Sequence, residues 1–151
     1  MARIAGIDVG TQRSHVVVID LLDRPKIAAV YEINTSDPRN IDVSHLKEIE
    51  GCDVVYIERP SPRYFGRKNA AVLLKVAARA GDIFARIAEN FSAVRCVFVD
   101  FDEWAEYITP KTTSREEIDN FFVEIFEKRL HNEHIRDAAV MALKMYRRHG
   151  S

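Results

Sequence analysis

The sequence predicts one α/β domain in which a five-stranded mixed sheet is flanked by helices. Three strand-like stretches come first and are joined by tight connections. Helical and strand-like stretches then alternate, which is typical of parallel strands joined by crossover helices. No linker or low-complexity stretch divides the 151 residues, a length that suits one ordinary domain. We therefore expect residues 1–151 to form a single domain.

The N-terminal part is predicted to form a meander of three strands. The expected strands cover residues 3–9, 15–22 and 26–33, all rich in Ile or Val or alternating in polarity. Residues 10–14 between the first two are a plausible hairpin turn. Residues 35–39 hold Ser, Asp and Pro and are expected to form a loop, followed by a short helix around 43–49.

The remaining elements alternate along the chain. Residues 53–58 are apolar on both faces, which predicts a central fourth strand parallel to the first. A long helix is expected over 69–90 and a fifth strand over 94–99. The C-terminal part is predicted to hold a short helix or turn over 101–107, an amphipathic helix from about Ser114 with Glu117 placed for a capping box, and a last helix over 131–148.

Composition limits the possible classes of protein. A net charge of −1 does not by itself indicate a nucleic-acid binder, so either DNA is not the ligand or the cations are concentrated on one face. No apolar run approaches the roughly 18 residues of a membrane span, and we expect a cytoplasmic protein with no membrane partner. Cys52 and Cys96 lack the paired spacing of a zinc site and are expected to be reduced core residues.

Three carboxylates stand among apolar residues at the predicted ends of elements. Asp8 ends the first strand, Glu58 ends the fourth, and Asp137 lies in the first turns of the last helix. If the two strands are neighbours, Asp8 and Glu58 come within about 5 Å, and like charges that close need a cation or a shared proton. His134 shares the helix face of Asp137. Taken singly, each of these residues could equally be a turn residue, a helix cap or a solvated surface residue. The prediction of an Mg²⁺ or Mn²⁺ site therefore rests on their occurrence together.

The motifs around these residues resemble those of the RuvC-type Holliday-junction resolvases, which belong to the RNase H-like superfamily. The similar motifs are Gly6-Ile7-Asp8-Val9-Gly10, Tyr56-Ile57-Glu58, Phe65-Gly66-Arg67-Lys68-Asn69-Ala70, Ala78-Arg79-Ala80-Gly81 and His134-x-x-Asp137-Ala138. The resemblance covers most of the chain. The region from Trp104 to Lys111 departs from the usual motif, and the compact size is closer to that of bacteriophage members than of cellular ones.

The resemblance implies an RNase H-like fold, a homodimer, two divalent ions per active site, and paired nicks across a four-way DNA junction. Catalytic and metal-binding roles would fall to Asp8, Glu58, His134 and Asp137, with Lys111 neutralising developing charge. A nuclease for other branched DNA or for RNA, and an inactive junction-binding module, remain alternatives. Asp-Val-Gly-Thr also resembles the phosphate loop of sugar-kinase and actin-like ATPases, which need two such domains and a longer chain.

The long helix predicts where the cations gather. Apolar or small side chains cover about two-thirds of its circumference, more than one sheet contact needs. The main apolar face consists of Leu73, Leu74, Ala77, Ala80, Phe84, Ile87, Ala88 and Phe91. The remaining wedge and the stretch before it supply the predicted DNA-binding cations Arg59, Arg63, Arg67, Lys68, Lys75 and Arg79. Phe65 is placed to stack on an unpaired base. We expect a symmetric dimer to bury the apolar surplus, the alternative being a helix buried on two sides within one domain.

Overall fold

A mixed five-stranded sheet forms the centre of the computed structural model, which describes residues 2–61, 70–105, 115–127 and 132–149. The strands are β1 (Ala2–Asp8), β2 (Arg13–Leu21), β3 (Lys26–Asn34), β4 (Val54–Arg59) and β5 (Arg95–Asp100). Their order is β3-β2-β1-β4-β5. β2 is antiparallel to both of its neighbours, whereas β1, β4 and β5 run parallel. The predicted fold class and the parallel pairing of the first and fourth strands are confirmed.

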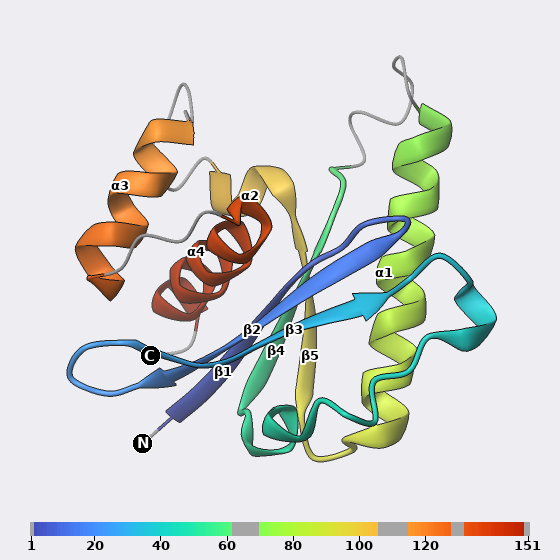
Figure 1. Cartoon of the computed structure of the whole chain (residues 1–151), viewed down its shortest axis with the longest axis horizontal. Coiled ribbons are helices and arrows are strands. Elements are labelled where there is room, and N and C mark those ends of the chain that lie inside the picture. The colour runs from blue at the N-terminus through green and yellow to red at the C-terminus, as the bar shows by residue number, and fades with distance from the viewer. Residues whose placement is uncertain (1, 62–69, 106–114, 128–131, 150–151) are drawn as a thin grey trace.

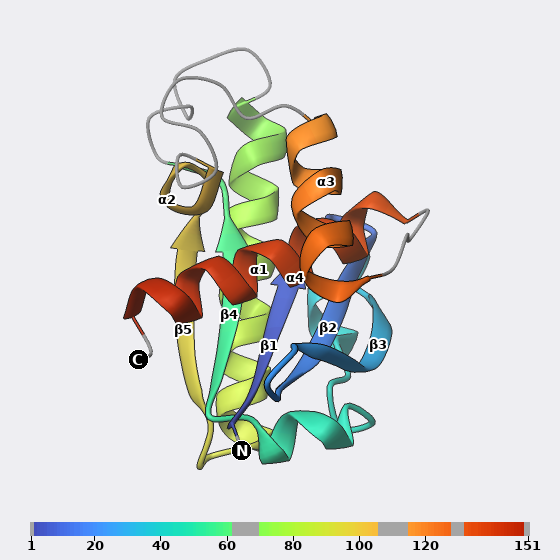
Figure 2. The same cartoon turned by 90° about the vertical axis from the view of Figure 1, so that its left-hand side faces the viewer.

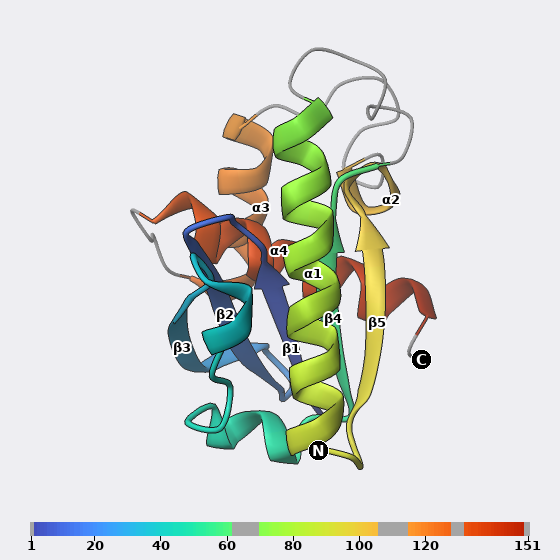
Figure 3. The ribbon, with the colours of Figure 1, turned by 90° about the vertical axis from the view of Figure 1, so that its right-hand side faces the viewer.

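Helices cover both faces of this sheet (Figure 1). The helices are α1 (Ala70–Asn90), α2 (Phe101–Ala105), α3 (Arg115–Phe126) and α4 (Glu133–His149). α1 lies across one face, as Figure 3 shows, and α4 crosses the opposite face together with α3 (Figure 2). Within the described ranges, no helix combines the length and the hydropathy that a membrane span requires.

Each face of the sheet has its own hydrophobic core. On the α4 face, Ile4 of β1 and Tyr56 of β4 pack with the alanine-rich side of α4. On the α1 face, Ile7 and Ile57 pack with Ile83 and its neighbours. Because the central strands are covered on both sides, they are apolar on both faces, as the sequence predicted. Cys52 and Cys96 are free thiols on the α1 side, which agrees with the prediction of reduced core cysteines.

The short helix expected around residues 43–49 begins later in the chain and is of the 3-10 type. A 3-10 turn covers Pro38–Asn40 and a 3-10 helix covers Lys47–Gly51. The Asp42 side chain accepts hydrogen bonds from the Ser44 backbone N at 2.9 Å and hydroxyl at 2.6 Å. This closed turn occupies the position where the helix would have begun, because short polar side chains compete with helical hydrogen bonding.

The buried face of α1 also differs from the expected one. Leu74 is 52% exposed and Ala88 is exposed, although both were assigned to the main apolar face. Ala80 and Ile87 of the expected face are fully buried against the sheet, and Ile83 is buried with them. The broad apolar arc allowed several orientations, and the tertiary contact with β4 and β5 selects the one centred on these three residues.

Candidate active site

Three adjacent strands each present a polar side chain to the same face at the same end of the sheet. Side chains alternate between the two faces of a strand, so Asp8 follows Ile4 and Gly6 on the α4 side of β1. The same alternation places Glu58 beyond Tyr56 on β4 and His15 beyond Val17 on β2. The register pairs Asp8 with His15 and Ile7 with Ile57, which brings the three polar residues side by side.

The last helix approaches these strand ends closely because β1 has a glycine beneath it. A Cβ atom built on Gly6 would lie 2.2 Å from the carbonyl oxygen of Ala138 and 2.9 Å from the Cβ of Ala142. Only glycine permits this approach without displacing the helix. The helix begins after Asn132, whose side chain accepts from the backbone N of His134 at 2.9 Å. The first turns of α4, with His134 and Asp137, therefore stand over the ends of the strands.

Asp8 and His134 are in direct contact. The His134 Nδ1 lies 2.8 Å from Asp8 Oδ2. The His15 ring stacks on the His134 ring, with centroids 4.9 Å apart and an interplanar angle of 6°. His15 Nε2 lies 3.5 Å from Glu32 Oε2. Asp8, His15 and His134 line a pocket together with residues 9–13, the turn that follows Asp8.

The turn after Asp8 is held by buried hydroxyl groups. Ser14 and Thr35 are both fully buried, and Thr35 Oγ1 donates to the carbonyl oxygen of Gly10 at 2.6 Å. The Gly10 backbone N donates to Ser14 Oγ at 3.1 Å. A Cβ on Gly10 would lie 2.3 Å from the carbonyl oxygen of Arg13, so this tight turn also requires a glycine. The pocket wall beside Asp8 is thereby fixed to β2 and β3.

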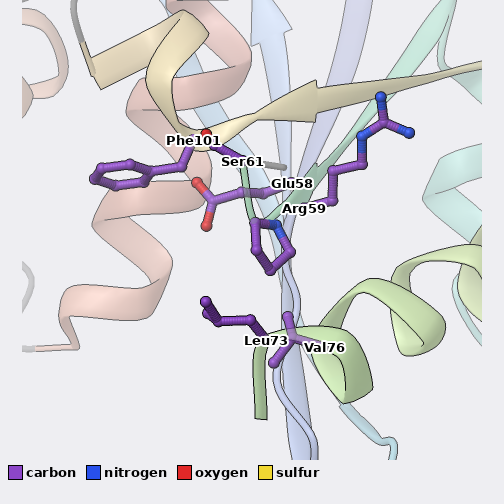
Figure 4. A pocket seen from close by; sticks show the side chains of 7 residues that line it. Glu58, Arg59, Ser61, Leu73, Val76 and Phe101 are labelled. Carbon is purple, nitrogen blue, oxygen red and sulfur yellow. The ribbon is translucent and has the colours of Figure 1, made fainter. Parts of the chain in front are cut away.

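Glu58 occupies the second half of the site. Its Oε2 accepts a hydrogen bond of 2.5 Å from Trp104 Nε1 of α2. Figure 4 shows its side chain at a pocket lined also by Leu73 and Val76 of α1 and by Phe101. Burial and the negative charge of Asp8 raise the pKa of Glu58 to about 8; the Trp104 hydrogen bond opposes this rise and Asp137 adds to it. Burial is the larger cause, so without a cation Glu58 is mainly protonated near neutral pH, and a cation bound beside Asp8 and Asp137 would favour its ionised form.

The donor set suits a hard divalent cation. Three carboxylates and one imidazole match the ligands of Mg²⁺ and Mn²⁺. Within the described residues, no three His, Cys, Asp or Glu side chains yet surround a common metal position. His134 and Asp8 contact each other, so both would have to turn toward an ion when it binds. Lys111, the predicted charge-neutralising residue, lies outside the described residues.

The predicted DNA-binding residues are only partly within the described ranges. Arg63, Phe65, Arg67 and Lys68 lie outside them. Arg59 Nε lies 2.6 Å from Asp100 Oδ1, and its guanidinium stands over the Phe98 ring. Lys75 is exposed on α1.

The Arg79 side chain is only 16% exposed, and its Nε donates to the carbonyl oxygen of Thr35 at 2.7 Å. Arg79 is thus less available to a phosphate than its helix position suggested.

Two residues of the site were missed by the sequence analysis. His15 could have been found, because it begins the expected second strand directly after the turn and so lies beside the end of the first strand, where Asp8 is. Trp104 carried no local signal, since its contact with Glu58 depends on where α2 docks. Both contact a predicted metal ligand directly.

No protein-family model matches this chain, and no curated protein matches it. Solved structures nevertheless share its fold. RuvC of T. thermophilus in complex with a Holliday junction substrate is 18% identical, with a TM-score of 0.71 over 99% of this chain and 97% of RuvC. The yeast mitochondrial Holliday junction resolvase Ydc2 is 16% identical, with a TM-score of 0.60 over 97% of this chain and 78% of Ydc2. The fowlpox virus resolvase, bound to Holliday junction DNA, is 12% identical with a TM-score of 0.53 over 97% of each chain.

These comparisons define the class of fold. The chain has the RNase H-like fold of the RuvC-type junction resolvases, as the motifs in its sequence predicted. At these identities the likeness concerns the fold, and the function has to be argued from the site.

Proposed function

We propose that this chain is a divalent-metal-dependent endonuclease that resolves four-way DNA junctions by paired symmetric nicks. One observation carries the proposal. Asp8 and Glu58, on neighbouring parallel strands, meet the His134 and Asp137 turn of α4 at one end of a resolvase-like fold. The raised pKa of Glu58 supports the proposal further, because a carboxylate held so near two others is poised to exchange its proton for a cation.

Asp8, Glu58, His134 and Asp137 would hold Mg²⁺ or Mn²⁺, with two ions in each active site. Such ions, when bound, supply an activated water and neutralise charge on the scissile phosphate. Asp8 contacts His134 and its charge acts on Glu58, so it lies between the two halves of the ligand set. Lys111 is proposed to neutralise developing charge at the phosphate. Lys75, Arg59 and the cations of 62–69 are proposed to contact the DNA backbone.

The proposal is tested on a synthetic four-way junction with arms that cannot migrate. The wild-type chain should nick two opposed strands in Mg²⁺ or Mn²⁺ and leave linear duplex intact. Asp8→Asn should lose cleavage and retain junction binding in a gel-shift assay. Asp23→Asn, which changes an exposed carboxylate in the β2–β3 turn, is the matched control and should cut normally.

Each alternative outcome has a distinct meaning. Cleavage by Asp8→Asn would refute the site assignment. Cleavage of a flap or an RNA–DNA hybrid in preference to the junction would replace the proposed substrate. Binding without cleavage in either metal would identify a junction-binding module.

We also propose that α1 joins two copies of the chain. Ala71, Leu74, Ala78, Gly81, Ala85 and Ala88 are exposed on α1 and recur at alternating intervals of three and four residues. This spacing forms one stripe along a helix, the pattern with which helices pair. Small side chains would let a second α1 approach closely, and the cations beside the stripe would then be duplicated by twofold symmetry.

A charge in the stripe should separate the copies. A Cβ on Gly81 meets no atom within 4 Å, so Gly81→Glu should leave each copy folded. We expect light scattering to give twice the chain mass of 17.3 kDa for the wild type and the single mass for Gly81→Glu. Ser92→Glu adds the same charge at an exposed position outside the helix and should remain dimeric. A wild-type mass of one chain at micromolar concentration would refute the dimer.

A further inference from the structure

We infer that Trp104 is a positioning residue, whose indole N–H fixes the Glu58 carboxylate for metal binding. The inference rests on the proposed function, since it assigns Glu58 to a metal site. Trp104 does not itself supply a ligand atom. It acts through the carboxylate that it contacts, as the hydrogen-bond partners of metal ligands do in other metal sites.

The contact is direct and directional. Trp104 Nε1 donates to Glu58 Oε2 over 2.5 Å, and the Trp104 side chain is 1% exposed. An indole nitrogen is a donor only, so it can hold a carboxylate oxygen and cannot compete for a cation. A carboxylate fixed through one oxygen can present its other oxygen in a defined direction. Glu58 has three side-chain torsions, and this bond restricts the rotamers it can adopt.

The short helix that carries Trp104 is fastened to the same strand that carries Glu58. The Asp102 backbone N donates to Ser61 Oγ at 3.1 Å, just beyond the end of β4. Arg59 Nε, on β4, lies 2.6 Å from Oδ1 of Asp100, the last residue of β5, directly before α2. Ser61 is buried. The ligand and the residue that positions it therefore belong to one locally braced unit.

The indole ring also contacts a second aromatic side chain. Phe101 packs edge-on against Trp104, with centroids 5.7 Å apart and an interplanar angle of 80°. The two aromatic side chains differ in exposure: Phe101 is 42% exposed, whereas Trp104 is buried. The indole N–H of Trp104 lies inside the molecule, where it needs a buried hydrogen-bond acceptor. Glu58 supplies that acceptor.

A packing role alone predicts different behaviour from a positioning role. Trp104 belongs to the core on the α4 face, together with Phe122. If packing were its whole contribution, Trp104→Phe would lower stability and leave metal affinity unchanged. If it positions Glu58, the loss of the N–H should weaken metal binding even where the fold is retained.

Calorimetric titration with Mn²⁺ separates the two roles. Trp104→Phe should bind Mn²⁺ about 10- to 100-fold more weakly than the wild type, the range found when a partner of a metal ligand is removed. Phe122→Leu is the matched control, because it loosens the same core without touching Glu58. It should lose stability and keep wild-type affinity. Equal affinity of Trp104→Phe and wild type would overturn the inference.

A second measurement needs no variant. Trp104 is the only tryptophan in the chain, so the protein has a single indole N–H resonance. Titration of ¹⁵N-labelled wild-type protein with Mg²⁺ should shift this resonance and saturate with metal binding. A resonance that does not move while metal binds would overturn the inference and leave the proposed function standing. Failure of the wild type to bind either metal would overturn both.

Discussion

The imidazole rings of His15 and His134 lie parallel, with centroids 4.9 Å apart and planes inclined by 6°. His134 contacts Asp8 on one side, and His15 lies near Glu32 on the other. Two stacked imidazoles cannot both carry a charge without repulsion. Burial lowers the pKa of His15, and the charge of His134 lowers it further. The stack therefore favours a neutral His15 that covers one face of a candidate metal ligand.

Replacement of His15 by Phe should change the acid sensitivity of the metal-free protein. Because the pKa of His15 is lowered in the fold, its contribution to stability is present above its ordinary value of 6.5 and is lost as pH falls through the folded value. His15→Phe keeps a flat ring on His134 and cannot be protonated. In urea unfolding at pH 7.5 and 5.5, the wild type should lose more stability on acidification than His15→Phe. Equal losses would show that His15 is not the responsible group.

Replacement of Glu58 by Gln should have the opposite dependence on pH. With a pKa of about 8 in the fold and 4.5 when unfolded, Glu58 favours folding at low pH, and this contribution is lost as pH rises from 4.5 through 8. Glu58→Gln has no such loss. In chelator-treated protein, it should gain about 1–3 kcal/mol relative to wild type between pH 5 and pH 9. A difference in unfolding free energy that does not vary with pH would contradict the assignment.

A methyl group on Gly6 should displace the last helix. The added Cβ would lie 2.2 Å from a backbone oxygen of α4, which cannot give way as a flexible side chain could. We expect Gly6→Ala to cost about 1–3 kcal/mol in stability and to weaken Mn²⁺ binding, since α4 carries His134 and Asp137. Gly51→Ala meets only the Arg3 side chain at 3.5 Å and should stay within about 0.5 kcal/mol of wild type. Wild-type stability of Gly6→Ala would refute the close approach.

The buried hydroxyl of Thr35 should stabilise the turn after Asp8. Thr35→Val keeps the shape of the side chain and leaves the Gly10 carbonyl oxygen without its 2.6 Å partner. A loss of about 1–2 kcal/mol is expected in urea unfolding. The neighbouring Ser36 is exposed and its hydrogen bonds within the described residues are local, to Asn34, so Ser36→Ala should change stability by less than about 0.5 kcal/mol. Equal effects of the two substitutions would argue against the network.

The sequence was sufficient to predict that Asp8 and Glu58 lie close together. Their positions depend only on local periodicity and on the pairing of the two strands that carry them. Asp8 and Glu58 end apolar strands, and a strand covered on both faces is central. Their proximity then follows from the parallel register of β1 and β4. The fold class was predictable for the same reason, since it depends on the order of elements and not on their side-chain contacts.

Other features depended on contacts that no local pattern encodes. Trp104 reaches Glu58 because α2 packs on β5 and α4, and because the Asp102 backbone N donates to Ser61 Oγ just beyond β4. Arg79 falls on the polar wedge of α1, yet its long side chain reaches back to a carbonyl oxygen of Thr35. The helical wheel gives the direction in which a side chain leaves the helix and not the point where its charged end arrives.

The contact between Asp8 and His134 joins residues that are 126 positions apart. It forms only after α4 has docked on Gly6, because the helix brings His134 over the end of β1. During synthesis, a nascent chain that has emerged only as far as β5 would have both strand carboxylates and no complete ligand set. The same dependence acts in reverse, since any excursion that detaches α4 separates His134 and Asp137 from the strand carboxylates. On the proposed function, cleavage of DNA would have to wait until α4 has been synthesised and has docked.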